Sequence, residues 1–188
     1  IEWDRIIEVS KRVYGSDQSA HPLSGYTDKA FPAYWHGQRS VAKDSLPVDD
    51  QVFPRVFSKH TDDNFARAGD LDGPQFEYAM FTAATGIDWS EDEYEHHLER
   101  VIHLERQLLI RNFNRSREDD ETLIPYLEKP ENLVNPHIGH VESLDRDKFR
   151  KVMDEYYALR GWDPATGHPT PETLVKFGLM RDETTNEH

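Results

Sequence analysis

Apolar side chains recur every three or four residues along several stretches of the chain, which is the spacing of amphipathic helices. The longest stretch runs from residue 90 to about residue 112, and its apolar stripe consists of Tyr94, Leu98, Val101, Leu104 and Leu108. Ser90 and Glu93 have the spacing of a capping box at its start. Alternating patterns typical of strands are nearly absent. The sequence therefore predicts an all-α, multihelical fold.

Shorter periodic stretches predict further helices, several of them ended by glycine. We expect these helices at residues 3–14, 33–43, 75–85 and 144–160, with a last short helix after Thr170. The apolar face of the third of them is expected to hold Phe76, Ala79, Met80 and Ala83.

The segment from Leu46 to Gly73 has no clear periodicity and is rich in proline, glycine and acidic pairs. Such a long irregular run in a compact domain is usually functional or mobile. We interpret it as a site-bearing segment or as a linker between two helical halves. The predicted organisation is a helical subdomain at residues 1–60 and a C-terminal helical domain at residues 61–188.

The charge balance of the 188 residues narrows the classes of partner. Lys and Arg number 22 and Asp and Glu number 36, so the net charge is −14. Nucleic-acid phosphates and anionic lipids attract basic surfaces, so we expect neither nucleic acid nor a membrane as a partner. No apolar run approaches the roughly 20 residues that span a bilayer, and no signal-peptide pattern is found.

The absence of Cys excludes disulfides, thiolate zinc sites and cysteine nucleophiles within this chain. The first residue is Ile1, and the sequence opens directly in a helical pattern. We interpret the chain as part of a longer chain or as a processed product.

Three groups of potential ligands stop short of a metal-site pattern. His96 and His103 lie two turns apart, whereas helical zinc and di-iron sites use closer pairs with carboxylates beside them. Residues 70–73 start like a calcium loop but lack its later ligands, which favours a turn. His137 and His140 have no third ligand beside them. We therefore expect surface histidines and structural loops at these places.

Two charged segments leave alternatives open. Carboxylates between Lys43 and Asp50 can bind a cation, accept hydrogen bonds from a heterocycle or cap a helix, and the general preference of Asp favours capping. The turn from Arg115 to Asp120 is either a solvated salt-bridge cluster or a fixed corner that packs against another domain. The sequence alone favours the solvated cluster.

A series of motifs along the chain resembles one known family. The motifs cover residues 84–88, 100–106, 113–115, 117–120, 153–163, 167–171 and 177–179. Their order resembles the C-terminal region of the tungsten-containing aldehyde:ferredoxin oxidoreductase family, over roughly Tyr26 to Leu179. The sequence from Lys43 to Leu46 resembles that of the benzoyl-coenzyme A reductase catalytic subunits, one branch of this family.

The resemblance implies an all-helical region of two domains that close over a tungsten bis-pterin cofactor and a nearby 4Fe-4S cluster. The family motif Asp-x-x-Gly-Leu-Cys aligns with residues 44–49. The cofactor-binding residues that it implies are Asp44, Ser45, Leu46 and Val48. Pro47 replaces the motif's Gly, and Asp49 replaces the Cys that ligates the cluster. The resemblance thus leaves three alternatives: Asp49 ligates the cluster, the cluster has only three protein ligands, or this protein has lost the cluster.

The resemblance also implies a catalytic acid–base in or just before this region. His21 lies in the right neighbourhood, with a surface role as the alternative. The first hypothesis is the C-terminal part of a tungsten-pterin, iron–sulfur oxidoreductase that acts on an aldehyde or a related oxo or acyl substrate. Its implied partners are the N-terminal part of the enzyme or other subunits, and a ferredoxin-type electron carrier. Oligomer formation is left open.

We expect such an enzyme to be cytoplasmic and this fragment alone to be inactive. The alternative is a degenerate or detached, non-catalytic helical domain that serves as an assembly or interaction scaffold, which the loss of the cluster Cys would favour. A third interpretation, a free-standing acidic helical binding module, requires the resemblance to be accidental.

Overall fold

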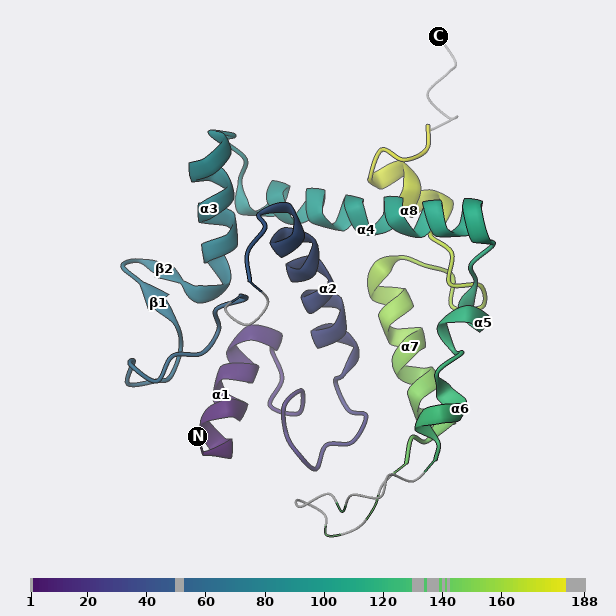
Figure 1. The fold of residues 1–188 in the computed structure, drawn as a ribbon, viewed down its shortest axis with the longest axis horizontal. Helices are drawn as coiled ribbons and strands as arrows, with labels where there is room; N and C mark the ends of the chain where they lie inside the picture. Colours follow the sequence, from purple (N-terminus) through teal and green to yellow (C-terminus); the bar gives the residue numbers. More distant parts are fainter. Residues whose placement is uncertain are drawn as a thin grey trace. The chain divides into compact units, whose positions relative to one another are not determined.

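The structure is a computed structural model that describes residues 2–49, 53–129, 134, 139, 141 and 143–181 (Figure 1). Its helices are α1 (Trp3–Tyr14), α2 (Ala30–Ser45), α3 (Phe76–Thr85), α4 (Glu91–Phe113), α5 (Arg117–Asp120), α6 (Ile124–Leu127), α7 (Arg146–Arg160) and α8 (Pro171–Lys176). A short antiparallel pair, β1 (Arg67–Ala68) and β2 (Leu71–Asp72), precedes the 3-10 turn η1 (Gly73–Gln75). The predicted all-α fold is confirmed.

Local signals set several of the helix ends. The backbone N–H of Ser90 donates to Glu93 Oε2 at 2.8 Å, and the N–H of Glu93 donates to Ser90 Oγ at 3.2 Å. This reciprocal pair is the predicted capping box at the start of α4. Gly161 follows α7 with a φ of 64°, a left-handed conformation that glycine adopts without strain. Helix α2 begins earlier than predicted, because Pro32 fits in a first turn, and it continues to Ser45.

The chain divides into two compact units, Ile1–Glu99 and Arg100–His188. Helix α4 contributes its first turns to the first unit and its later turns to the second. Residue 60 lies inside the first unit, and the subdomain boundary expected there stays a prediction. In the described part of the chain, no helix is long and apolar enough to cross a bilayer.

The apolar core of the first unit is largely aromatic. Ala42 of α2 packs with Tyr94 and Leu98 of α4. The half-buried side chains around them are Val41, Tyr78, Phe81 and Trp89. Ring stacking extends this core, since the centroid of Trp89 lies 5.1 Å from that of Phe81 and 3.9 Å from that of His97. Helices α2, α3 and α4 are thus held together by one cluster.

The inward face of α3 differs from the prediction. Met80 and Ala83 are exposed, whereas the Glu77 side chain is fully buried. The physical reason is a partner from another helix, because the Arg39 guanidinium of α2 donates to the Glu77 carboxylate at 3.0 Å. An ion pair from a distant segment has therefore overridden the apolar pattern.

The second unit buries polar and aromatic side chains together. His103 of α4 is fully buried, so its predicted surface position is wrong. Trp162 Nε1 donates to His103 Nδ1 at 2.9 Å, and the Phe177 ring lies 4.5 Å from the His103 ring. Leu104 and Leu108 of the predicted apolar stripe are 40% and 38% exposed. In this half of α4 the buried face is therefore the one that carries His103, because Trp162 and Phe177 pack against that residue.

Residues 46–49 and 53–73, the described part of the segment between Leu46 and Gly73, are largely irregular, as predicted. Its short hairpin pairs Arg67 with Asp72 and Ala68 with Leu71. Asp70 lies in the turn of the hairpin, whereas Leu71 and Asp72 form β2. Asp72 forms a capping box with Gln75 at η1, so the favoured turn is found at Asp70 and the capping Asp is Asp72. Gly73 permits a close approach of two backbones, since an added Cβ would lie 1.5 Å from the carbonyl oxygen of Arg55.

Candidate functional site

Residues 44–49, which align with the cofactor motif, form the C-terminal end of α2 and the start of the following loop. The backbone N–H of Val48 donates to the carbonyl of Lys43, five residues earlier, at 3.1 Å. A bond with this spacing is the outer bond of a Schellman cap. Pro47 lacks the N–H that would make the inner bond of such a cap, which a glycine at this position would supply.

Asp44 and Ser45 are exposed on the last turn of α2. No hydrogen bond joins the Asp44 carboxylate to another residue in the described part of the chain. A carboxylate at this end of a helix faces the negative end of the macrodipole, which is unfavourable by about 0.3–1 kcal/mol. Asp44 caps no helix, so the favoured capping interpretation is wrong for this residue. Its exposed oxygens can accept hydrogen bonds from a ligand.

The rest of the motif adds little that could hold a metal. Leu46 and Val48 are half-buried and Asp49 is exposed, while the Asp49 carbonyl accepts the N–H of Phe53 at 3.0 Å. Within the described residues, no group of three or more His, Asp or Glu side chains could hold a metal ion. Asp50, His137 and His140 lie outside the described residues.

On its other side, α2 directs two cationic side chains, Arg39 and Lys43, into the first unit, where both are buried. Arg39 Nη1 donates to Glu77 Oε2 at 3.0 Å, and Nη2 pairs with Glu95 of α4. Burial raises the pKa of Glu77 to about 7, against the lowering effect of Arg39. Sequence reasoning missed this group, because a Glu between two aromatic residues in a helix does not by itself indicate burial.

A second titratable pair joins α1 to α2. Tyr14 Oη and His36 Nε2 lie 2.7 Å apart, and the Trp35 ring is 5.7 Å from the Tyr14 ring. Burial lowers the pKa of His36, and the nearby positive charges on Lys43 and Arg39 lower it further. Burial also raises the pKa of Tyr14. Both groups are therefore neutral near pH 7, and the sequence analysis missed them.

His21, the candidate acid–base, lies half-buried in the loop between α1 and α2. Its Nδ1 accepts the backbone N–H of Leu23 at 3.1 Å, and its carbonyl accepts the Ser24 hydroxyl at 2.8 Å. These are local bonds that shape the loop. A catalytic role for His21 stays a prediction.

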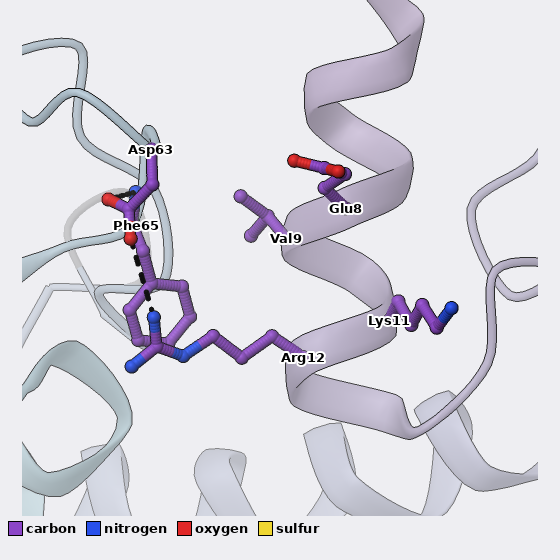
Figure 2. Close-up of a pocket in the computed structure, with 6 residues that line it drawn as sticks. All are labelled: Glu8, Val9, Lys11, Arg12, Asp63 and Phe65. Carbon is purple, nitrogen blue, oxygen red and sulfur yellow. Dashed lines mark hydrogen bonds and ion pairs between the residues drawn. The ribbon is translucent and has the colours of Figure 1, made fainter.

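A pocket of about 310 Å³ opens between α1 and the loop that holds Asp63 and Phe65 (Figure 2). The Arg12 guanidinium lies 3.9 Å from the centroid of the Phe65 ring and 3.4 Å from Asp63 Oδ2. The other lining residues are Glu8, Val9 and Lys11. None of these six is a predicted site residue, so the pocket gives the cofactor motif no support.

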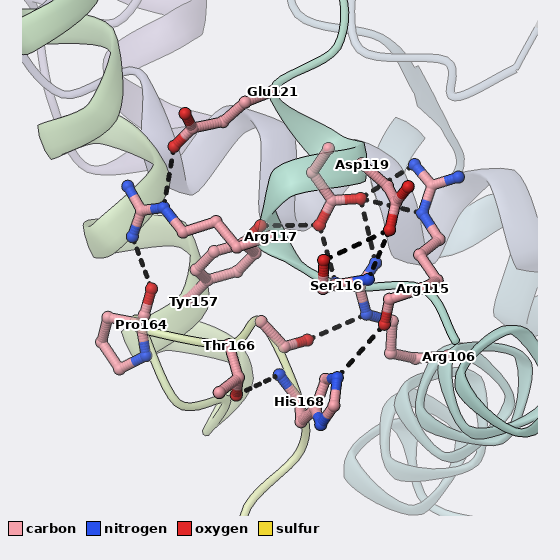
Figure 3. A network of polar contacts seen from close by, with 12 residues as sticks. Arg106, Arg115, Ser116, Arg117, Asp119, Glu121, Tyr157, Pro164, Thr166 and His168 are labelled. Carbon is pink, nitrogen blue, oxygen red and sulfur yellow. Dashed lines mark hydrogen bonds and ion pairs between the residues drawn. The ribbon is translucent and has the colours of Figure 1, made fainter. Parts of the chain in front are cut away.

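In the second unit, Asp120 accepts hydrogen bonds from several sides, and its donors Arg106, Arg115 and Tyr157 are labelled in Figure 3. Arg106 donates to both of its carboxylate oxygens at 3.0 and 2.7 Å, Arg115 Nε donates at 2.9 Å, and the Tyr157 hydroxyl donates at 2.6 Å. Burial acts to raise the pKa of Asp120, but the bonds from Arg106 and Tyr157 outweigh it and lower the pKa. The Asp120 side chain is 16% exposed and that of Arg106 is 6% exposed, so the solvated-cluster interpretation is wrong here.

An open pocket of about 550 Å³ lies beside this network. Its lining residues are Arg117, Glu118, Glu121, Arg150, Pro164 and Ala165. Glu121 accepts from both Arg117 and Arg150, at 2.9 and 2.6 Å. The charges of Arg117, Glu121 and Arg150 are thus paired with one another, which indicates a structural role for these three side chains.

A family comparison covers most of the chain. The family model described as aldehyde ferredoxin oxidoreductase, domains 2 and 3, matches residues 2–179. The matched range includes every helix from α1 to α8 and the motif at residues 44–49. No solved structure matches the chain significantly. The chain belongs to the aldehyde ferredoxin oxidoreductase family and corresponds to its domains 2 and 3.

Proposed function

We propose that this chain is the C-terminal part of a tungsten-pterin oxidoreductase that acts on an aldehyde or a related oxo or acyl substrate. One observation carries the proposal: the family match over residues 2–179 includes a helix end at which the motif's Asp is exposed and makes no hydrogen bond within the described chain. An ionised carboxylate is an acceptor only, so Asp44 suits the N–H groups of a pterin ring.

The residues at the end of α2 fit a pterin in chemical type. Asp44 would accept hydrogen bonds from it, the exposed Ser45 hydroxyl could donate or accept, and Leu46 and Val48 would flank it. The Val48 N–H is already bonded to the Lys43 carbonyl, so it is not offered to a ligand. A bound tungsten bis-pterin would supply the two-electron chemistry, while these residues would bind and orient it.

The donor set of this chain does not fit a 4Fe-4S cluster. Cluster iron is held by thiolates, and the chain has no Cys. Asp49 offers a harder carboxylate ligand, and no group of three or more potential ligands surrounds any point among the described residues. If the assembled enzyme holds a cluster, its thiolates come from outside this chain and Asp49 at most supplements them.

The remaining parts of the proposal concern the wider enzyme. The partners would be its N-terminal part or other subunits, with a ferredoxin-type carrier as electron acceptor, and the isolated chain would be inactive. His21 is the proposed acid–base, and a cytoplasmic location is proposed with it. The sequence from Lys43 to Leu46 supports membership of the benzoyl-coenzyme A reductase branch. The substrate would then be an aromatic acyl thioester.

Metal analysis of the longest natural chain that contains this segment, purified anaerobically, tests the proposal. We expect tungsten, and we expect Asp44→Ala to lower its content at least about tenfold, as loss of a charged hydrogen-bond acceptor would. Asp88→Ala, at another exposed site, should retain it. Tungsten without iron would mean that the cluster is lost. Neither metal would overturn the proposal and favour the scaffold alternative.

A substrate comparison separates the branches. The same preparation is assayed with aldehydes and with an aromatic acyl-coenzyme A, using a low-potential dye as electron donor or acceptor. Turnover of the thioester supports the benzoyl-coenzyme A reductase branch, whereas turnover of aldehydes alone overturns that part of the proposal and retains the rest.

A further inference from the structure

A cluster of buried ionisable side chains joins α2, α3 and α4 inside the first unit. Arg39 pairs with Glu77 of α3 and with Glu95 of α4. Beside it, Gln38 Nε2 donates to Glu99 Oε2 at 2.7 Å. Arg39, Glu77 and Glu99 are 2%, 0% and 4% exposed, so water solvates little of this cluster.

One guanidinium in this cluster is shared by two carboxylates. Arg39 pairs with both Glu77 and Glu95, and only the Oε2 atom of Glu77 receives its hydrogen bond. Burying an ionised carboxylate is costly when its hydrogen bonds are incomplete. Arginine stays protonated at all accessible pH values. The cost is relieved most simply when one carboxylate takes up a proton.

Glu77 is the carboxylate with the strongest reason to do so. The Glu95 side chain is 33% exposed and retains solvent, and Glu99 accepts from Gln38. Glu77 Oε1, in contrast, is buried and has no hydrogen-bond partner in the described part of the chain. The Tyr94 hydroxyl is also buried and has no hydrogen-bond partner in the described part of the chain.

We propose that Glu77 is a proton-binding site, whose carboxylate takes up one proton from solvent on Oε1 near neutral pH while Arg39 stays ionised and paired with Glu95. The proton adds to an existing lone pair, so no other bond breaks and no electron moves. Protonation also converts an acceptor without a partner into a donor. The proton-binding site does not depend on the proposed enzymatic function.

The electrostatics agree with this geometry. Burial raises the pKa of Glu77 to about 7, although Arg39 and Lys43 lower it and Glu95 raises it. Burial raises the pKa of Glu95 as well, with Arg39 opposing. The pKa of Tyr94 rises to about 12, chiefly through burial and then through the Glu77 charge. The Tyr94 hydroxyl therefore stays neutral over the range in which Glu77 exchanges its proton.

Infrared difference spectroscopy of the full chain tests the proposal, because a protonated carboxyl group has a carbonyl band that a carboxylate lacks. We expect one such band at pH 5.5 that disappears toward pH 8.5 with a midpoint near 7. Glu77→Gln should abolish it. Glu155→Gln, which changes an exposed Glu of α7, should leave it unchanged.

Three outcomes would overturn the proposal. They are the absence of a band that titrates in this range, its persistence in Glu77→Gln, and its loss in Glu95→Gln instead. If Glu77→Gln does not fold, Glu77→Asp provides the assignment, since it keeps a carboxyl group but moves it within the same buried site. A changed frequency or midpoint of the band in Glu77→Asp supports the proposal, and an unchanged band refutes it.

Discussion

Replacing Asp120 with Asn should destabilise the second unit by about 3 kcal/mol. The Asp120 carboxylate receives two bonds from Arg106 and one from the Tyr157 hydroxyl, at 3.0, 2.7 and 2.6 Å. An Asn side chain keeps the shape and one acceptor oxygen, but its amide nitrogen would face an N–H donor of Arg106. The Arg106 guanidinium would then be buried with half of its partner lost.

The magnitude follows from burial. Removing one partner of a buried ion pair costs about 3–5 kcal/mol, because the remaining charge is left uncompensated. The Arg115 side chain is 39% exposed, so its share is at most about 1 kcal/mol. The retained acceptor oxygen and the 16% exposure of Asp120 move the expectation to the lower end of the range, about 3 kcal/mol.

Urea unfolding followed by near-ultraviolet circular dichroism measures the effect, since Trp162 lies with its ring 4.9 Å from the Arg106 guanidinium and reports on this unit. Asp147→Asn, an exposed change in the first turn of α7, is the matched control and should cost a few tenths of a kcal/mol. A loss for Asp120→Asn below about 1 kcal/mol would refute the assignment of a buried pair.

The pH dependence gives a second check of the same residue. The folded state lowers the pKa of Asp120, so this group stabilises the fold above its unfolded pKa of about 3.9. That stability is lost as the pH falls through the lower, folded-state pKa. Asp120→Asn should therefore lose less stability between about pH 5 and pH 2 than the wild type does. Equal losses would contradict the reasoning.

Two further changes test other parts of the structure. Gly73→Ala should lower stability by about 2 kcal/mol or more, because the new Cβ would meet the Arg55 carbonyl oxygen at 1.5 Å; an unchanged urea midpoint would contradict this. The pKa of Glu77 in the folded state, about 7, lies above its ordinary value of 4.5, so the folded state binds the extra proton. The free energy of unfolding should therefore fall by about 3 kcal/mol in all as the pH rises from about 5 to 8. Glu77→Gln should flatten this slope in urea unfolding measured at several pH values, and parallel slopes for the variant and the wild type would refute the reasoning.

Helix ends were predictable because their signals are short-range. Ser90 and Glu93 lie within one turn of each other, and the capping box needs no distant partner. The same holds for Gly161, whose left-handed conformation ends α7 locally. The overall helical class follows from the sum of such signals and the apolar spacing.

Buried polar residues were not predictable in the same way. Glu77 is buried because Arg39 reaches it from 38 positions away, and His103 is buried because Trp162 donates to it from 59 positions away. An apolar periodicity contains no information about such partners, so it placed Met80 and Leu104 inside instead.

The role of the candidate residues 44–49 stays a prediction, and their environment was not predictable from the sequence. The motif located residues 44–49, and the structure places them where α2 ends. The exposure of Asp44 depends on how that helix ends, which residue types alone did not determine. The capping preference of Asp consequently misled the interpretation.

Helix α4 belongs to both compact units, and this sharing limits how the protein can be divided. A cut between Glu99 and Arg100 would leave one part with the turns from Glu91 onward and the other with those that end at Phe113. Isolated helices shorter than about 12–15 residues are marginally stable in water, so each fragment of α4 would stay helical only through its contacts with its own unit. If the turns of α4 in one unit unfolded, the unfolding would extend along this helix toward its turns in the other unit. We therefore expect thermal melting to begin in one unit and spread through this helix, so that neither unit retains its full stability when expressed alone.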